Sequence, residues 1–147
     1  MISVSGHMSE VSWRHNGRQP LFNVTILPPA PTTDLRGVSD VALLDTGSTS
    51  SGITRRLAES LGLVGRGKRP IASAHSESQV EHYWFRVALQ PDSVDSAPTF
   101  PFVFEEVVGF ELRNAFQFQI LIGMDILRQC DLTMTRDHRC LLQFGRS

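Results

Sequence analysis

The sequence predicts a single, mainly β domain with one or two short helices. Its apolar runs are short, rich in Val, Ile, Leu and Phe, and bounded by Pro, Gly, Ser or Asp, a pattern typical of strands joined by turns. One segment, residues 53–61, instead repeats its apolar side chains at helical intervals. The chain has 147 residues, which is a single-domain length that buries enough surface for an ordinary core.

In the N-terminal half we expect two strands followed by the main helix. Residues 21–27 alternate between apolar and polar side chains, and the prolines from Pro28 onward end this strand because proline cannot donate to a ladder. Residues 38–44 form a second strand whose apolar end leads into a polar turn. The helix follows over 53–61, and Gly62 stands at its stop position.

In the C-terminal half we expect further strands and a second short helix over 124–128. The strands are expected at 71–74, 80–89, 100–110, 118–122, 132–134 and 140–144. A polar tip over 75–79 joins the first two of them into a hairpin, and residues 91–101 form a proline-bounded connection. A turn at 136–138 joins the last two.

The domain is expected to cover residues 18–147, preceded by a flexible segment over 1–17. Within that segment, the run Gly6-His7-Met8 is typical of a cloning scar before a natural start at Met8, and a natural N-terminus is the alternative. The segment has neither the basic start nor the apolar run of a signal peptide, so the expected location is the cytoplasm.

Charge and cysteine content argue against several classes of protein. Fourteen Lys and Arg against fifteen Asp and Glu leave a formal charge of −1, which favours neither nucleic acid nor an anionic membrane as a partner. No run approaches the roughly 18 apolar residues of a membrane span. Cys130 and Cys140 are too few for a disulfide scaffold, and a single bridge is the less favoured alternative. The His and Cys residues show no metal-ligand spacing, so no metal or other cofactor is expected.

The segment most informative about function is Asp45-Thr46-Gly47-Ser48. An apolar strand delivers a carboxylate into a turn of small residues, where backbone N–H groups can donate to its ionised form. Gly47 lets the backbone approach that carboxylate closely. Taken alone, these residues favour an ordinary turn after a strand.

A second segment changes that interpretation. Residues 120–127 read as an apolar strand, then Gly123, then a short helix-like run. The two segments together resemble the retropepsin-like aspartic proteases, which carry apolar-apolar-Asp-Thr/Ser-Gly-Ser/Ala and, downstream, apolar-apolar-Gly before a short helix. Residues 43–48 and 121–123 match these motifs in order, 78 residues apart from Asp45 to Gly123. The resemblance covers about residues 20–145 and implies a closed β fold, half of a pepsin-type fold, that works as a homodimer.

The resemblance also implies a role for each matching residue. Asp45 is the expected catalytic aspartate, and the hydroxyl of Thr46 is expected to clasp the backbone of a partner chain. The expected supports of the active-site loop are Thr46, Gly47, Ser48, Ile122 and Gly123; among them Gly47 offers its N–H to the carboxylate, and Ser48 hydrogen-bonds its outer oxygen. The hairpin tip matches the position of the flap that closes over substrate. The candidate flap residues are Ala74, His75, Ser76, Glu77 and Ser78, and they depart from the glycine-rich flaps of retroviral members.

The chemistry of this family needs two carboxylates. Two close aspartates cannot both ionise freely, so one keeps a proton while the other activates a water that attacks the peptide carbonyl. The chain has a single Asp-Thr-Gly, so the second carboxylate is expected from another copy of the chain. The predicted function is therefore an aspartic endopeptidase acting on extended peptides. The alternative is a non-catalytic dimerisation or peptide-binding module on the same fold. Asp125, beside the second motif, is expected to cap the helix or to be structural.

Overall fold

The computed structural model describes residues 8–29, 35–72, 77–93, 99–113 and 117–145. These residues form ten strands and two short helices, as the sequence pattern predicted for a mainly β domain. The elements are β1 (Ser9–Arg14), β2 (Leu21–Leu27), β3 (Val38–Leu44), β4 (Gly52–Thr54), α1 (Arg55–Ser60), β5 (Lys68–Ala72), β6 (Glu77–Leu89), β7 (Phe102–Leu112), β8 (Ile120–Ile122), α2 (Met124–Leu127), β9 (Cys130–Met134) and β10 (Arg139–Phe144). Among them, no helix is long and apolar enough to cross a membrane.

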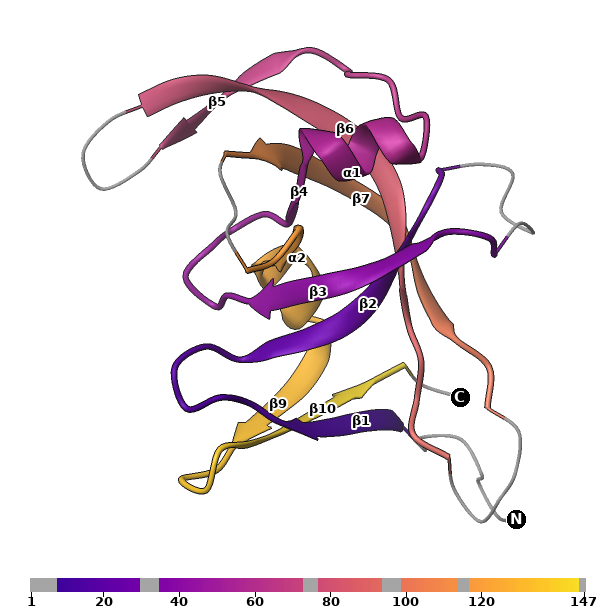
Figure 1. Ribbon diagram of the computed structural model, residues 1–147, viewed down its shortest axis with the longest axis vertical. Helices are drawn as coiled ribbons and strands as arrows, with labels where there is room; N and C mark the ends of the chain where they lie inside the picture. The colour runs from indigo at the N-terminus through magenta and orange to yellow at the C-terminus, as the bar shows by residue number, and fades with distance from the viewer. Residues whose placement is uncertain (1–7, 30–34, 73–76, 94–98, 114–116, 146–147) are drawn as a thin grey trace, which may run out of the picture.

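Seven strands form one sheet that closes on itself. Their order is β2-β3-β8-β4-β7-β6-β5, and β2 also pairs with β6, so the sheet curls into a barrel-like shape (Figure 1). The 13-residue β6 closes the sheet, because its first part pairs with β5 and its last part pairs with β2. A register shift against β7 between Phe85 and Val87 accompanies this, since a bulge bends a strand and increases its twist.

The remaining strands form a separate sheet in the order β1-β10-β9. Residues 9–14 were expected to be flexible, and the structure differs: they form β1, which pairs antiparallel with β10. The Trp13 ring stacks on Phe22 with 4.4 Å between ring centroids, which ties this sheet to the barrel. At the outer edge of β1, the Asp92 carboxylate accepts hydrogen bonds from the backbone N–H and the hydroxyl of Ser12 at 3.0 and 3.1 Å.

The core is built from apolar side chains on most strands of the barrel, on the helices and on β10 of the smaller sheet. Burying one such side chain contributes about 1.5–3 kcal/mol. Those that are at most 1% exposed include Ile26, Leu27, Ile53, Phe85, Val87, Ile120, Ile122, Ile126, Leu142 and Phe144. All three residues of β8 are buried because that strand lies inside the sheet, between β3 and β4. Cys130 and Cys140 are free.

The placement of β8 decides where the candidate catalytic loop lies. β3 pairs with β8 in parallel, with Leu44 opposite Ile122, and β8 pairs antiparallel with β4. β3 and β4 are consecutive in the chain, so residues 45–51 must pass over the end of β8 to connect them. The first sequence motif and the strand of the second are thereby brought together.

The main helix is shorter than the sequence pattern predicted. The expected helix over 53–61 is wrong at its start: Ile53 lies in β4, and α1 covers only Arg55–Ser60. Ile53 is fully buried between the neighbouring strands, and its β-branched side chain suits a strand. Thr54 then acts as the N-cap, with its hydroxyl accepting a hydrogen bond from the Leu57 N–H at 3.2 Å.

The hairpin expected around residues 75–79 is present as β5 and β6, which pair antiparallel from Lys68 opposite Glu81 to Ala72 opposite Glu77. Ala74, His75 and Ser76 of the candidate flap lie outside the described residues, whereas Glu77 and Ser78 begin β6. In Figure 1 this hairpin and the loop after β3 extend toward the same side of the view.

Candidate active site

Asp45 stands at the point where β3 leaves the sheet. Its backbone N–H donates to the Ile122 carbonyl at 2.9 Å, which continues the pairing of β3 with β8 by one residue. Its side chain is half-buried, and Thr46 and Gly47 beside it are exposed. The Gly47 N–H donates to Asp45 Oδ1 at 2.9 Å, as the sequence predicted, and this contact orients the carboxylate.

Ser48 makes a different contact from the predicted one. Its hydroxyl was expected to bond the outer oxygen of Asp45, but it donates to the Ser50 carbonyl at 2.7 Å. The loop bends back on itself after Ser48, and this brings the Ser50 carbonyl within reach. Ser48 still supports Asp45 through its backbone, since its N–H donates to the Asp45 carbonyl at 3.3 Å.

Ile122 and Gly123 lie directly beneath the loop. Ile122 is 1% exposed and accepts the Asp45 N–H. A Cβ atom on Gly123 would lie 2.5 Å from the Ser50 carbonyl oxygen and 2.8 Å from that of Ser48, so no side chain fits there. Close approach of the loop backbone is what requires glycine at this position.

Two residues bind the loop to α2 in a way that the sequence did not reveal. Asp125 was interpreted as a helix cap or a structural residue. Its carboxylate accepts hydrogen bonds from the Ser51 N–H at 3.0 Å and from the Ser51 hydroxyl at 2.7 Å. Ser51 itself was not singled out. The available signal was the run of hydroxyl residues after Asp45 together with a carboxylate two positions after Gly123.

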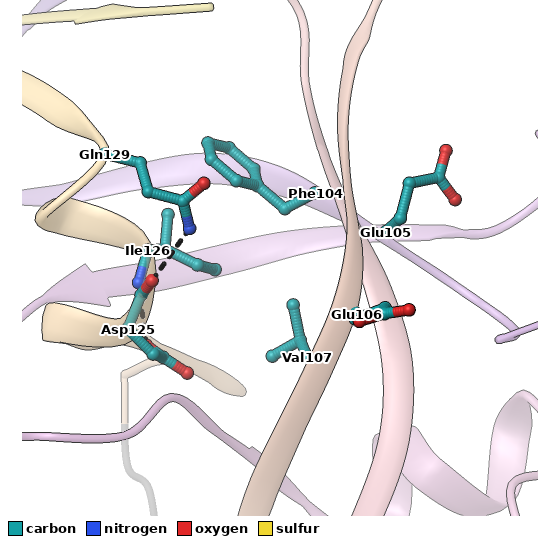
Figure 2. A pocket seen from close by; sticks show the side chains of 7 residues that line it. All are labelled: Phe104, Glu105, Glu106, Val107, Asp125, Ile126 and Gln129. Carbon is teal, nitrogen blue, oxygen red and sulfur yellow. Dashed lines mark hydrogen bonds between the residues drawn. The ribbon is translucent and has the colours of Figure 1, made fainter.

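A cavity of about 300 Å³ lies between α2 and β7 (Figure 2). Phe104, Val107 and Ile126 give it apolar walls, and Glu105 and Glu106 line the side formed by β7. Asp45 is not among its lining residues. Within the described part of the chain, no group of three or more His, Cys, Asp or Glu side chains could hold a metal ion.

A second polar cluster joins β6, β7 and α1. The Tyr83 hydroxyl donates to Glu111 at 2.6 Å, and Arg55 donates to the same carboxylate at 3.1 and 3.4 Å. Burial, with help from the hydrogen bond to Glu111, raises the pKa of Tyr83 to about 12. Burial by itself would raise the pKa of Glu111, but the hydrogen bonds from Tyr83 and Arg55 together outweigh it and lower that pKa.

Comparisons with known proteins agree with this geometry. A family model described as aspartyl protease matches residues 32–126, a span that contains the Asp45 loop, Gly123 and Asp125. No curated protein matches the chain. Among solved structures, the chain is similar to the crystal structure of a retropepsin-like aspartic protease from Rickettsia conorii, with a TM-score of 0.63 and 17% sequence identity over 100% of both chains. At that identity the similarity shows a shared fold.

Proposed function

Because the chain belongs to the aspartyl protease family and has a retropepsin-like fold, we propose that it is an endopeptidase whose active site forms between two copies of the chain. In the proposed dimer each copy contributes one Asp45. The two loops meet about a twofold axis, and an extended peptide lies between them and the two β5–β6 hairpins, which act as flaps. An isologous interface of this kind is what a closed dimer requires.

The observation that carries the proposal is the setting of Asp45. Its carboxylate is fixed by the Gly47 N–H, yet it is only half-buried and lies beside the exposed residues Thr46 and Gly47. A purely structural carboxylate would be expected to point into its own protomer and to have its partners there. This one lies on a turn at the surface of the protomer, where a second copy can reach it.

The chemistry follows from bringing two such carboxylates together. Like charges at close range disfavour double ionisation, so the pair holds one proton. The ionised Asp45 takes a proton from a water, the water oxygen attacks the peptide carbonyl carbon, and the protonated Asp45 donates to the carbonyl oxygen. The tetrahedral intermediate then collapses: the C–N bond breaks, the amine leaves with a proton from the pair, and one hydroxyl of the intermediate returns a proton, so that the pair again holds one. Both the doubly ionised and the doubly protonated pair lack one of these functions, so the pH profile should be bell-shaped with an acidic optimum.

The test is the substitution Asp45→Asn, which removes the ionisable group and nearly keeps its shape. Hydrolysis of a peptide library should fall by roughly 10²–10⁴-fold, the usual contribution of general acid–base groups, while sedimentation still shows a dimer. Asp40→Asn is the matched control, because Asp40 is a carboxylate on β3, the strand that leads into Asp45, and its contact in the described residues is with the N–H of Val41 at 2.7 Å. The control should keep native activity.

Two results would contradict the proposal. Hydrolysis that survives Asp45→Asn in pure protein would exclude Asp45 as the catalytic group. Native dimer that hydrolyses no peptide across an acidic-to-neutral range would instead favour a peptide-binding module on the same fold.

A further inference from the structure

We infer that Ser51 and Asp125 form a positioning pair that holds the Asp45 loop in its catalytic conformation. The inference rests on the proposed function, since it assigns a role in the same reaction to two residues that do not touch the reacting atoms. Asp125 lies 80 positions after Asp45 and Ser51 lies at the end of the loop, so the pair connects the two sequence motifs.

Backbone contacts bring the loop and the start of α2 together. The Met124 N–H donates to the Ser48 carbonyl at 2.7 Å, and the Asp125 N–H donates to the Thr49 carbonyl at 3.1 Å. The loop is thereby held at its middle, while the Asp45 N–H holds its beginning against Ile122. These contacts are available to any sequence that avoids a side chain at Gly123.

At the end of the loop, side-chain bonds add to the backbone bond from the Phe110 N–H to the Ser51 carbonyl at 3.0 Å. Asp125 Oδ1 accepts a hydrogen bond from the Ser51 hydroxyl at 2.7 Å, and Asp125 Oδ2 accepts one from the Ser51 N–H at 3.0 Å. The Ser51 hydroxyl oxygen in turn accepts the Gly123 N–H at 3.0 Å. Both carboxylate oxygens of Asp125 therefore accept a hydrogen bond from Ser51. Ser51 is fully buried. If the Asp125 carboxylate or the Ser51 hydroxyl were removed, the donors that bond to it would therefore lose an acceptor that water does not replace.

Helix capping does not account for these contacts. Asp125 lies in the first turn of α2, and its carboxylate accepts one N–H from that helix, that of Ile126 at 2.9 Å. Its two bonds to Ser51 reach a segment 74 positions earlier. A cap alone would need neither a buried hydroxyl partner nor a second acceptor oxygen aimed at the loop.

α2 also borders the cavity that lies between it and β7. Figure 2 shows the cavity between α2 and β7, with Glu105 and Glu106 on the wall opposite Asp125. The bond that Figure 2 draws from the Gln129 side chain, at 2.9 Å, goes to the Asp125 carbonyl and does not compete with Ser51 for the carboxylate.

The experiment compares Asp125→Asn, Ser51→Ala and the double variant with the native protein. Asp125→Asn keeps the size of the side chain and places an NH₂ group where a donor of Ser51 needs an acceptor. Asp131→Asn, an exposed carboxylate on β9, and Ser60→Ala, a hydroxyl that donates to the Leu57 carbonyl at 2.7 Å in α1, are matched controls. Each variant is assayed at a concentration where sedimentation shows dimer.

Two readouts are measured on every variant. Hydrogen exchange in residues 45–51 should be about tenfold faster in Asp125→Asn and in Ser51→Ala, with β10 unchanged. The kcat should fall about tenfold with KM within about twofold, because misplaced catalytic groups slow the chemical step. If the two residues act as one unit, the double variant should lose no more than the worse single variant, whereas independent effects would multiply.

The outcomes separate this inference from the proposed function. Native exchange in the loop together with native kcat in Asp125→Asn would overturn the positioning role and leave the protease proposal standing. Multiplying losses in the double variant would also overturn the pair as a unit. If the native dimer hydrolyses nothing, the protease proposal fails, and the exchange measurement alone decides whether Ser51 and Asp125 hold the loop.

Discussion

Gly123 is the residue at which the geometry of the loop is most demanding. We expect Gly123→Ala to destabilise the protein by about 1–3 kcal/mol, because the new Cβ would lie 2.5 Å from a backbone oxygen of Ser50 that must shift. The same shift should lower activity. Urea unfolding and peptide hydrolysis measure the two effects.

Gly62 provides the control for that substitution. Its φ is +68° and nothing lies within 4 Å of a Cβ placed there, so Gly62→Ala carries a conformational cost without a clash. It should cost about 1 kcal/mol and leave the activity of the folded protein native. Equal loss of activity in both variants would show that the contact beneath the loop has no special effect.

Thr46 is expected to act between protomers. Its side chain is exposed in the single chain, so Thr46→Ala should change the free energy of unfolding of the protomer by less than about 0.5 kcal/mol. If its hydroxyl clasps the partner's backbone, two such bonds are lost per dimer at about 0.5–1.5 kcal/mol each, and the dimer Kd should rise by roughly 5- to 150-fold. Sedimentation measures this, with exposed Thr49→Ala as the control. An unchanged Kd would contradict the clasp.

At the scale of elements, the contact of Glu111 with Tyr83 and Arg55 joins β7 to β6 and α1. The pKa of Glu111 is lowered in the fold, so its contribution to stability is fully present above its ordinary value of 4.5 and is lost as pH falls through the lower folded pKa. Glu111→Gln should therefore flatten the decline of stability with pH below about 4.5. Urea unfolding of both proteins from pH 3 to 7 tests this, and an unchanged slope would contradict it.

The strands that the sequence predicted best are those with local stop signals. β2 and β3 begin and end at the predicted residues, because prolines follow one and a polar turn follows the other. β4 was taken for part of a helix, since Ile53 joins it to the helical spacing and only pairing with β7 and β8 makes it a strand. β1 was missed for a similar reason, as its partner β10 lies more than 120 positions away.

In the candidate site, too, the features that depend on local sequence were predictable and those that depend on distant contacts were not. The turn at Asp45, the contact from Gly47 and the support of the loop by Ile122 and Gly123 follow from motifs that are local in sequence. The partner of the Ser48 hydroxyl depends on how the loop bends, and the bonds of Ser51 depend on a contact across 74 positions. The spacing of residue types predicts neither of these contacts.

At the scale of the whole molecule, a barrel-like fold presents the Asp45 carboxylate on a surface turn. The chain has one Asp-Thr-Gly, and the family's chemistry needs two carboxylates. Completion of the site by a second copy accounts for both facts. It also makes activity a property of the pair of chains, so that one defective chain should disable a dimer that contains one native partner.

That consequence gives the most direct test, in which native protein is mixed with the Asp45→Asn variant above the dimer dissociation constant. Random pairing in an equal mixture leaves about one quarter of the dimers with two native Asp45 residues, so activity per native chain should fall to about half. A larger excess of the variant should lower it in proportion. Activity per native chain that stays constant, while sedimentation or mass measurement shows mixed dimers, would contradict a site built from two Asp45 carboxylates.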